Sequence, residues 1–124
     1  MTFFVRPAGG GDTYAFGGAT FTVKASGTDT EGRVGVMEQA APAGLTVPAH
    51  THDGEDEMFY VLDGEVRGFC GDEEFTAAAG GFIFLPRDVV HGLEVVGGRP
   101  ARLLTIVGPA KFDALVAGQG TPLT

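Results

Sequence analysis

Short stretches of alternating apolar and polar residues run through most of the chain, separated by turn residues at intervals of roughly 8–12 residues. This alternation predicts strands, because successive side chains of a strand point to opposite faces. The predicted strands are residues 20–25, 33–39, 45–52, 57–62, 65–70, 73–77, 82–85, 91–96 and 102–107. So many short strands predict an all-β fold, either a sandwich or a barrel.

Glycine and proline interrupt nearly every window of the chain, which contains 21 glycines and 7 prolines. A helix-rich fold is therefore excluded, and the pair Asp63-Gly64 predicts a tight hairpin. Only residues 109–117 have a helical pattern, since Phe112, Leu115 and Val116 fall on one face of a short C-terminal helix. Residues 3–6 are open to three interpretations: an edge strand, a strand exchanged with a second copy, or a disordered tail.

The length of 124 residues predicts one domain, and 44% hydrophobic residues are enough for a packed core. We expect residues 1–124 to form this single domain, with its core at about 33–107. Residues 1–11 would be an N-terminal tail or exchanged strand, and residues 109–124 a C-terminal extension.

The formal net charge of -8 argues against binding to nucleic acid or to anionic membranes. The sequence has no run of about 18 apolar residues, and its first residues have no basic segment typical of a signal peptide. Cys70 is the only cysteine, so no internal disulfide can form. We therefore expect a cytoplasmic protein.

All three histidines fall in one constellation with a glutamate: His50, His52, Glu57 and His91. Residues i and i+2 of a strand point to the same face, so His50 and His52 can bind one ion together. A hairpin-like return would bring Glu57 back beside them, and the fold would have to bring in His91. Three imidazoles and a carboxylate can hold a divalent metal and leave positions open for chemistry.

An acidic run, residues 53–57 with Gly54 as its only uncharged member, surrounds the glutamate of this constellation. The simplest interpretation is a solvated turn, and the alternative is a patch that attracts cations. Glu55 or Asp56 would be able to replace Glu57 as a ligand, although the spacing favours Glu57.

The two segments that carry these residues resemble the two motifs of the cupin family. The first motif is matched by Gly44, His50, His52, Glu57 and Gly64, and the second by Gly80, Pro86 and His91. Asp88 and Val95 depart from the second motif, which prefers glycine and asparagine there; Asp88 would need a turn conformation that aspartate tolerates. The resemblance implies a double-stranded β-helix (jelly-roll) barrel, commonly dimeric, with metal bound by His50, His52, Glu57 and His91.

Within the cupins the motifs look most similar to the quercetin 2,3-dioxygenase-like group. The leading hypothesis is a dioxygenase that acts on a small aromatic or enolic substrate and uses one divalent ion, Fe, Mn, Ni or Zn. Glu57 would take a proton from the substrate, and Phe59 and Val61, on the same face as Glu57, would line the pocket. The alternatives are a redox-neutral cyclase or isomerase, and a ligand-binding or sensor protein without turnover.

Assembly is expected to be a homodimer. Met58, Tyr60 and Leu62 point away from the face of Glu57 and would pack against a second sheet or an interface. A two-fold dimer is the commonest oligomer, and the exchanged N-terminal strand would be one way to form it.

Overall fold

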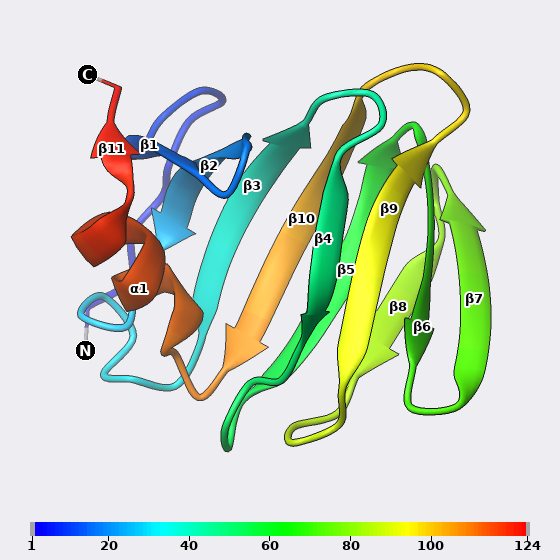
Figure 1. Cartoon of the computed structure of the whole chain (residues 1–124). Coiled ribbons are helices and arrows are strands. Elements are labelled where there is room, and N and C mark those ends of the chain that lie inside the picture. The colour runs from blue at the N-terminus through cyan, green and yellow to red at the C-terminus, as the bar shows by residue number, and fades with distance from the viewer. Residues whose placement is uncertain (1, 124) are drawn as a thin grey trace.

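The computed structural model describes residues 2–123, which form two antiparallel sheets facing each other (Figure 1). The larger sheet has the strand order β11-β1-β2-β3-β10-β5-β8, and the smaller one has the order β4-β9-β6-β7. The strands are β1 Thr13–Phe16, β2 Ala19–Ala25, β3 Gly35–Ala41, β4 Thr46–His50, β5 Asp56–Asp63, β6 Glu65–Cys70, β7 Glu73–Ala78, β8 Phe82–Leu85, β9 His91–Val96, β10 Ala101–Gly108 and β11 Thr121–Pro122. One helix, α1 Phe112–Gln119, follows β10.

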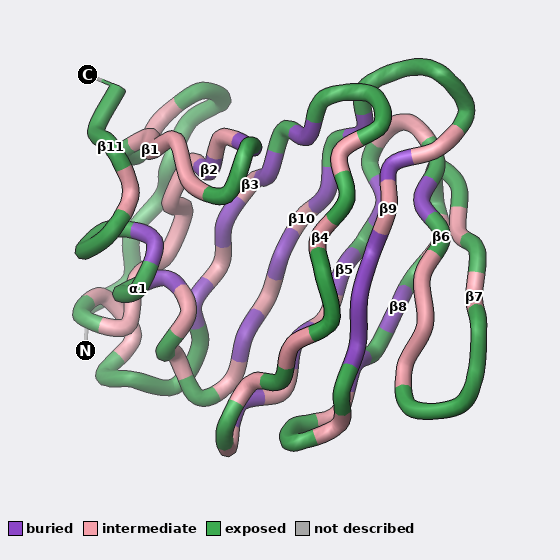
Figure 2. Tube along the Cα trace, viewed as in Figure 1, coloured by how far each residue is buried: buried purple, intermediate pink, exposed green. Residues whose placement is uncertain are grey.

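The core lies between the two sheets, where alternate side chains of the central strands are buried (Figure 2). In β10, Leu103 and Val107 are completely buried, whereas Arg102 is exposed. Val61 of β5 and Val66 of β6, one from each sheet, are also completely buried and belong to the same core. The alternation of apolar and polar residues in the sequence thus corresponds to alternation of buried and exposed side chains in the strands.

The predicted all-β jelly roll is confirmed, with one correction to its shape. Within residues 2–123 the strands form two separate hydrogen-bonded sheets, so the fold is a sandwich rather than a closed barrel. The predicted strands all occur, with ends shifted by a few residues. The hairpin at Asp63-Gly64 is replaced by a crossing between sheets, because β5 lies in the larger sheet and β6 in the smaller one.

Both ends of the chain differ from the prediction. The structure has no strand at residues 3–6, contrary to the edge-strand interpretation; Arg6 instead donates to the Asp29 carboxylate at 3.0 Å. Two short strands, β1 and β11, were not expected and pair with each other. The ends of the predicted domain, residues 1 and 124, lie outside the described residues.

The predicted C-terminal helix is confirmed as α1, although its buried face is different. Val116 is completely buried and Phe112 packs against the core, but Leu115 is 41% exposed and Asp113 is buried. Figure 1 shows α1 beside β1 and β2, at the end of the larger sheet opposite β8. None of the helices within residues 2–123 has the length and apolar character needed to cross a membrane.

Candidate metal centre

Two of the three histidines come from paired neighbouring strands of the smaller sheet. β4 runs antiparallel to β9, and their register places His50 directly opposite His91. Pro48 lies in the irregular part of this pairing, between Val47 and His50, where no ladder hydrogen bond is needed from it. The two imidazole centroids are 4.4 Å apart, so residues 41 positions apart in the sequence meet through strand pairing alone.

His52 and Glu57 complete the cluster from outside this strand pair. His52 lies beyond the end of β4, and Glu57 lies on β5 of the opposite sheet. Glu57 therefore reaches the histidines across the sandwich, and the expected hairpin-like return beside them is wrong. Glu57 Oε1 lies 3.5 Å from His52 Nε2 and 3.4 Å from His91 Nε2.

The four side chains can hold one metal ion. The candidate ligand atoms of His50, His52, Glu57 and His91 all lie within 4.8 Å of one another. His91 is 3% exposed, and its Nε2 is buried without a hydrogen-bond partner among the described residues. An unpaired buried nitrogen is costly unless something binds it, so a metal ion fits this donor set.

Each histidine is held by its other ring nitrogen, Nδ1. His50 Nδ1 lies 2.8 Å from the carbonyl oxygen of Pro48, and His91 Nδ1 lies 3.3 Å from that of Val89. Since a carbonyl oxygen only accepts hydrogen bonds, both Nδ1 atoms carry the proton and both Nε2 atoms present a lone pair. This is the tautomer that a metal ion requires.

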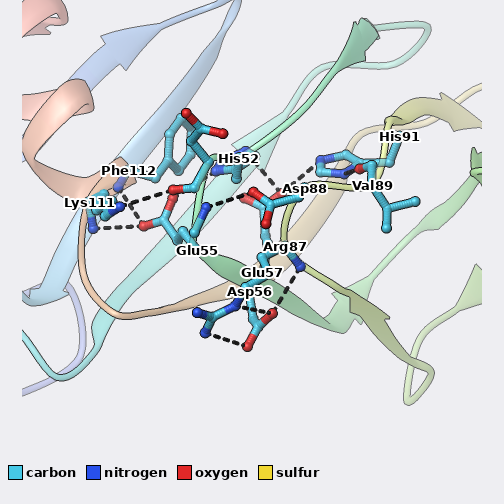
Figure 3. Close-up of polar contacts among 12 residues, drawn as sticks. His52, Glu55, Asp56, Glu57, Arg87, Asp88, Val89, His91, Lys111 and Phe112 are labelled. Carbon is cyan, nitrogen blue, oxygen red and sulfur yellow. Dashed lines mark hydrogen bonds and ion pairs between the residues drawn. The ribbon is translucent and has the colours of Figure 1, made fainter.

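The third histidine is held differently, by the carboxylate of Glu55 (Figure 3). His52 Nδ1 donates to Glu55 Oε1 at 2.7 Å. Glu55 Oε2 accepts the backbone N–H groups of Lys111 and Phe112, each at 2.7 Å, at the start of α1. Glu55 is only 3% exposed, so the expectation of a solvated acidic turn is wrong at this position.

The charge state of this pair follows from its contacts. The hydrogen bond that His52 donates to Glu55 raises the pKa of His52 above its usual value, although burial acts in the opposite direction. Burial alone would raise the pKa of Glu55, but the hydrogen bonds from His52, Phe112 and Lys111 outweigh it and hold that pKa below its usual value. Glu55 is therefore a buried, ionised carboxylate with three donors.

Asp56 and Asp88 connect the segment that follows His52 with the loop that precedes His91. Asp88 has a φ of 66°, which confirms the turn conformation expected of it, and its Oδ1 accepts the N–H of Gly54 at 2.8 Å. The glycine preferred by the motif would have no side chain for this bond. Asp56 accepts the backbone N–H of Arg87 at 2.9 Å and also pairs with its guanidinium, so Asp56 is directed away from the histidines.

A small cavity of about 90 Å³ reaches the cluster from inside the sandwich. Phe59, Glu57, His50 and His91 line it, whereas Val61 is completely buried in the core and does not border it. A larger hollow of about 700 Å³ lies outside the cluster and is bordered by His52, Lys111 and Leu115 among others. Phe16, Val47, His50 and Phe112 border both spaces, so they lie between the cavity and the surface.

Sequence reasoning missed three aromatic residues of this region. The rings of Phe16, Phe21 and Phe112 contact one another edge to face, with centroids 5.7–6.2 Å apart. Phe112 also packs on His52, with centroids 5.2 Å apart. Only the helical pattern around Phe112 pointed to any of them, because their partners are far away in the sequence.

Comparison with known proteins agrees with this architecture. Quercetin 2,3-dioxygenase of Bacillus subtilis is 24% identical over 119 residues, which are 96% of this chain and 35% of that protein. The chain thus spans about a third of the length of this relative. An uncharacterised protein of Methanocaldococcus jannaschii is 28% identical over 69 residues, and the match covers 56% of this chain and 55% of that protein.

Solved structures give the same fold. A predicted oxalate decarboxylase from Thermotoga maritima superposes with a TM-score of 0.78 at 18% identity, covering 86% of this chain and 99% of the other. The protein TT1209 of Thermus thermophilus is 33% identical, with a TM-score of 0.59, over 63% of this chain and 74% of the other. The family model of the cupin domain matches residues 36–107, which is more than half of the chain. The chain therefore belongs to the cupin family.

Proposed function

We propose that this protein is a metal-dependent dioxygenase whose ion is held by His50, His52, Glu57 and His91. The observation that carries the proposal is Nε2 of His91, which has no hydrogen-bond partner among the described residues and is buried in a cluster whose four candidate ligand atoms lie within 4.8 Å of one another. Iron, manganese, nickel and zinc all suit imidazole and carboxylate ligands, so availability would decide among them. A bound ion would supply Lewis-acid or redox chemistry beside these four side chains.

Glu57 is the residue proposed to move a proton. Its carboxylate lies at the inner cavity and is 3% exposed. A carboxylate there would take the proton of an enolic or phenolic hydroxyl group that enters the cavity, as a general base. Phe59, beside it in the cavity wall, would contact the apolar part of the substrate.

The size of the cavity favours a small reacting group. A volume of about 90 Å³ is well below the roughly 300–1,000 Å³ of pockets for drug-sized ligands. We propose that only the enolic or aromatic head of the substrate reaches Glu57, while any larger part occupies the outer hollow of about 700 Å³. Phe16 and Phe112, between the two spaces, would exclude water from the reacting group.

The test is oxygen uptake by protein reconstituted separately with Fe²⁺, Mn²⁺, Ni²⁺ and Zn²⁺, against a panel of flavonols, β-diketones and smaller enediols. The proposal predicts uptake with at least one redox-active ion, and its loss in Glu57→Gln. Turnover without oxygen consumption would instead indicate the redox-neutral cyclase or isomerase. The similarity to the Bacillus dioxygenase over 96% of the chain makes the oxidative reaction the first to be tested.

A binding or sensor protein without turnover is the second candidate, and the narrow inner cavity is the observation that favours it. Under this alternative a small ligand would bind to the ion without being changed. Binding seen by calorimetry, together with no product from any ion and substrate pair, would establish this candidate over the enzyme.

We also propose a homodimer formed through the outer face of β5 and β8. Phe82 and Phe84 of the edge strand β8 are 59% and 52% exposed, and Tyr60 of β5 pairs with Phe82. Ion pairs such as Arg102–Glu38 flank this face, so two copies would not repel each other there despite the net charge. Light scattering should give a dimer that Phe84→Glu converts to a monomer; a wild-type monomer would contradict the proposal.

A further inference from the structure

We infer that Glu55 is a positioning residue that couples metal binding at His52 to the docking of α1. The inference rests on the metal site of the proposed function and adds a residue that belongs to neither cupin motif. Among the described residues, the Glu55 carboxylate accepts hydrogen bonds both from His52 and from the backbone at the start of the helix. Figure 3 shows its carboxylate between His52 on one side and Lys111 and Phe112 on the other.

The helix depends on Glu55 because it has no cap of its own. Lys111 occupies the N-cap position and makes no side-chain capping bond. Asp113, in the first turn, is directed elsewhere: its Oδ2 accepts the N–H of Gly27 at 2.8 Å. The first amide groups of a helix have no partner within the helix, so the two bonds to Glu55 Oε2 replace the missing cap.

The histidine depends on Glu55 for its tautomer. An ionised carboxylate only accepts hydrogen bonds, so His52 keeps its proton on Nδ1 and presents the lone pair of Nε2 to the site. His50 and His91 obtain the same tautomer from backbone carbonyl groups, which no substitution can remove. His52 is therefore the ligand whose orientation is set by a replaceable side chain.

Glutamine at position 55 cannot serve both partners. Its single carbonyl oxygen can accept either from His52 or from the two amides of α1, and its NH₂ group must face the other side. If the NH₂ group faces His52, Nδ1 must become the acceptor and the proton moves to Nε2, where it blocks the metal. If the NH₂ group faces α1, two N–H donors lose their acceptor, and the helix loosens.

The coupling must act in both directions. A metal ion that holds His52 in one orientation fixes Glu55, and Glu55 then holds the amides of Lys111 and Phe112 more firmly. By linkage, firm docking of α1 must strengthen metal binding by the same factor. Because Phe112 borders both the inner cavity and the outer hollow, metal binding would also fix one wall of the path to the site.

The experiment compares the full-length wild type with Glu55→Gln, Glu55→Asp and the control Asp53→Asn. Asp53 is exposed in the same turn, and its carboxylate takes part in none of these bonds, so the control removes the same charge. Zn²⁺ affinity is measured by competition with a chelator, and the Co²⁺ absorption spectrum reports the ligand set. Amide exchange at Lys111 and Phe112 is measured by NMR with and without Zn²⁺.

We expect Glu55→Gln to bind Zn²⁺ about 10–100-fold more weakly than wild type and to change the Co²⁺ spectrum. Exchange at Lys111 and Phe112 should be about tenfold faster or more, and Zn²⁺ should slow it in wild type but not in Glu55→Gln. Asp53→Asn should match wild type. Glu55→Asp keeps the carboxylate on a shorter side chain and should lie between them, which also tests the inference if Glu55→Gln does not fold.

Equal Zn²⁺ affinity in wild type and Glu55→Gln, or equal losses in Glu55→Gln and Asp53→Asn, would overturn the inference while leaving the metal site intact. Exchange at α1 that ignores Zn²⁺ in wild type would also overturn it. A wild-type protein that binds no Zn²⁺ and no Co²⁺ would instead refute the proposed function itself.

Discussion

The two sides of the metal centre are built in different ways. On one side, His50 and His91 are opposite each other on paired strands, and the backbone carbonyl groups of Pro48 and Val89 hold their rings. On the other side, His52 lies in a turn, and the side chain of Glu55 holds its ring. The first side is fixed by the sheet itself, whereas the second depends on a few contacts, among them those of Glu55 and of the helix it contacts.

This difference indicates where the site tolerates change. Strand pairing sets the positions of His50 and His91 through many backbone bonds, so single side-chain changes elsewhere should move them little. The position of His52 depends on a few side-chain contacts, including the ring of Phe112 at 5.2 Å. Changes around His52 and α1, the helix side of the centre, should therefore tune the metal affinity. Changes around His50 and His91, the strand side, should abolish metal binding or unfold the protein.

The largest effect is expected from His91→Ala, which removes a ligand from the strand side. Zn²⁺ affinity should fall by more than the roughly 10–100-fold loss that follows removal of an outer-shell partner such as Glu55. The metal-free protein should stay folded, because the change deletes a buried nitrogen that has no hydrogen-bond partner. Calorimetric titration measures the affinity. Binding of His91→Ala as tight as that of wild type would show that the ion sits elsewhere.

A second change affects β6, the strand that pairs with β9, which carries His91. At Gly68 of β6 an added Cβ would lie 2.2 Å from the backbone oxygen of Gly92, the residue after His91. Neither atom can move without shifting a strand, so Gly68→Ala should lower the free energy of unfolding by about 1–3 kcal/mol. Urea denaturation would measure this loss. A neutral effect would mean that the strand side is more adaptable than strand pairing implies.

The smallest effect is expected on the helix side, where Gly118→Ala serves as the matched glycine change. An added Cβ at Gly118 meets no atom within 4 Å. Alanine favours helix more than glycine does, so the variant should gain up to about 1 kcal/mol in the free energy of unfolding. The same denaturation experiment checks this gain. A loss of stability in Gly118→Ala would contradict the helical conformation of residue 118 in α1.

The strand side of the metal centre could be predicted from the sequence more completely than the helix side. The strands followed from alternation and turn residues, and the spacing of His50, His52, Glu57 and His91 pointed to one cluster because the cupin motifs specify these positions together. Glu55 looked like any member of the acidic run at residues 53–57. Its partners at the start of α1 are backbone amides 56 and 57 positions away. Almost every residue has a backbone amide, so the sequence does not indicate which ones Glu55 binds.

One signal would have pointed to Glu55. Neither serine, threonine, aspartate nor asparagine occurs at residues 107–111, around the start of the helix predicted at residues 109–117, so the helix needed an acceptor from elsewhere. The closure of the sheets was also beyond the sequence. Whether two sheets join at their edges depends on how far each strand bends, and side-chain alternation does not encode this.

The most direct test of the central claim is a crystal structure of metal-loaded protein with anomalous diffraction data collected at the absorption edge of the ion. The account predicts a single strong peak bound by the Nε2 atoms of His50, His52 and His91 and by the carboxylate of Glu57. A peak at other residues, coordination through any Nδ1 atom, or no peak at saturating metal would contradict it.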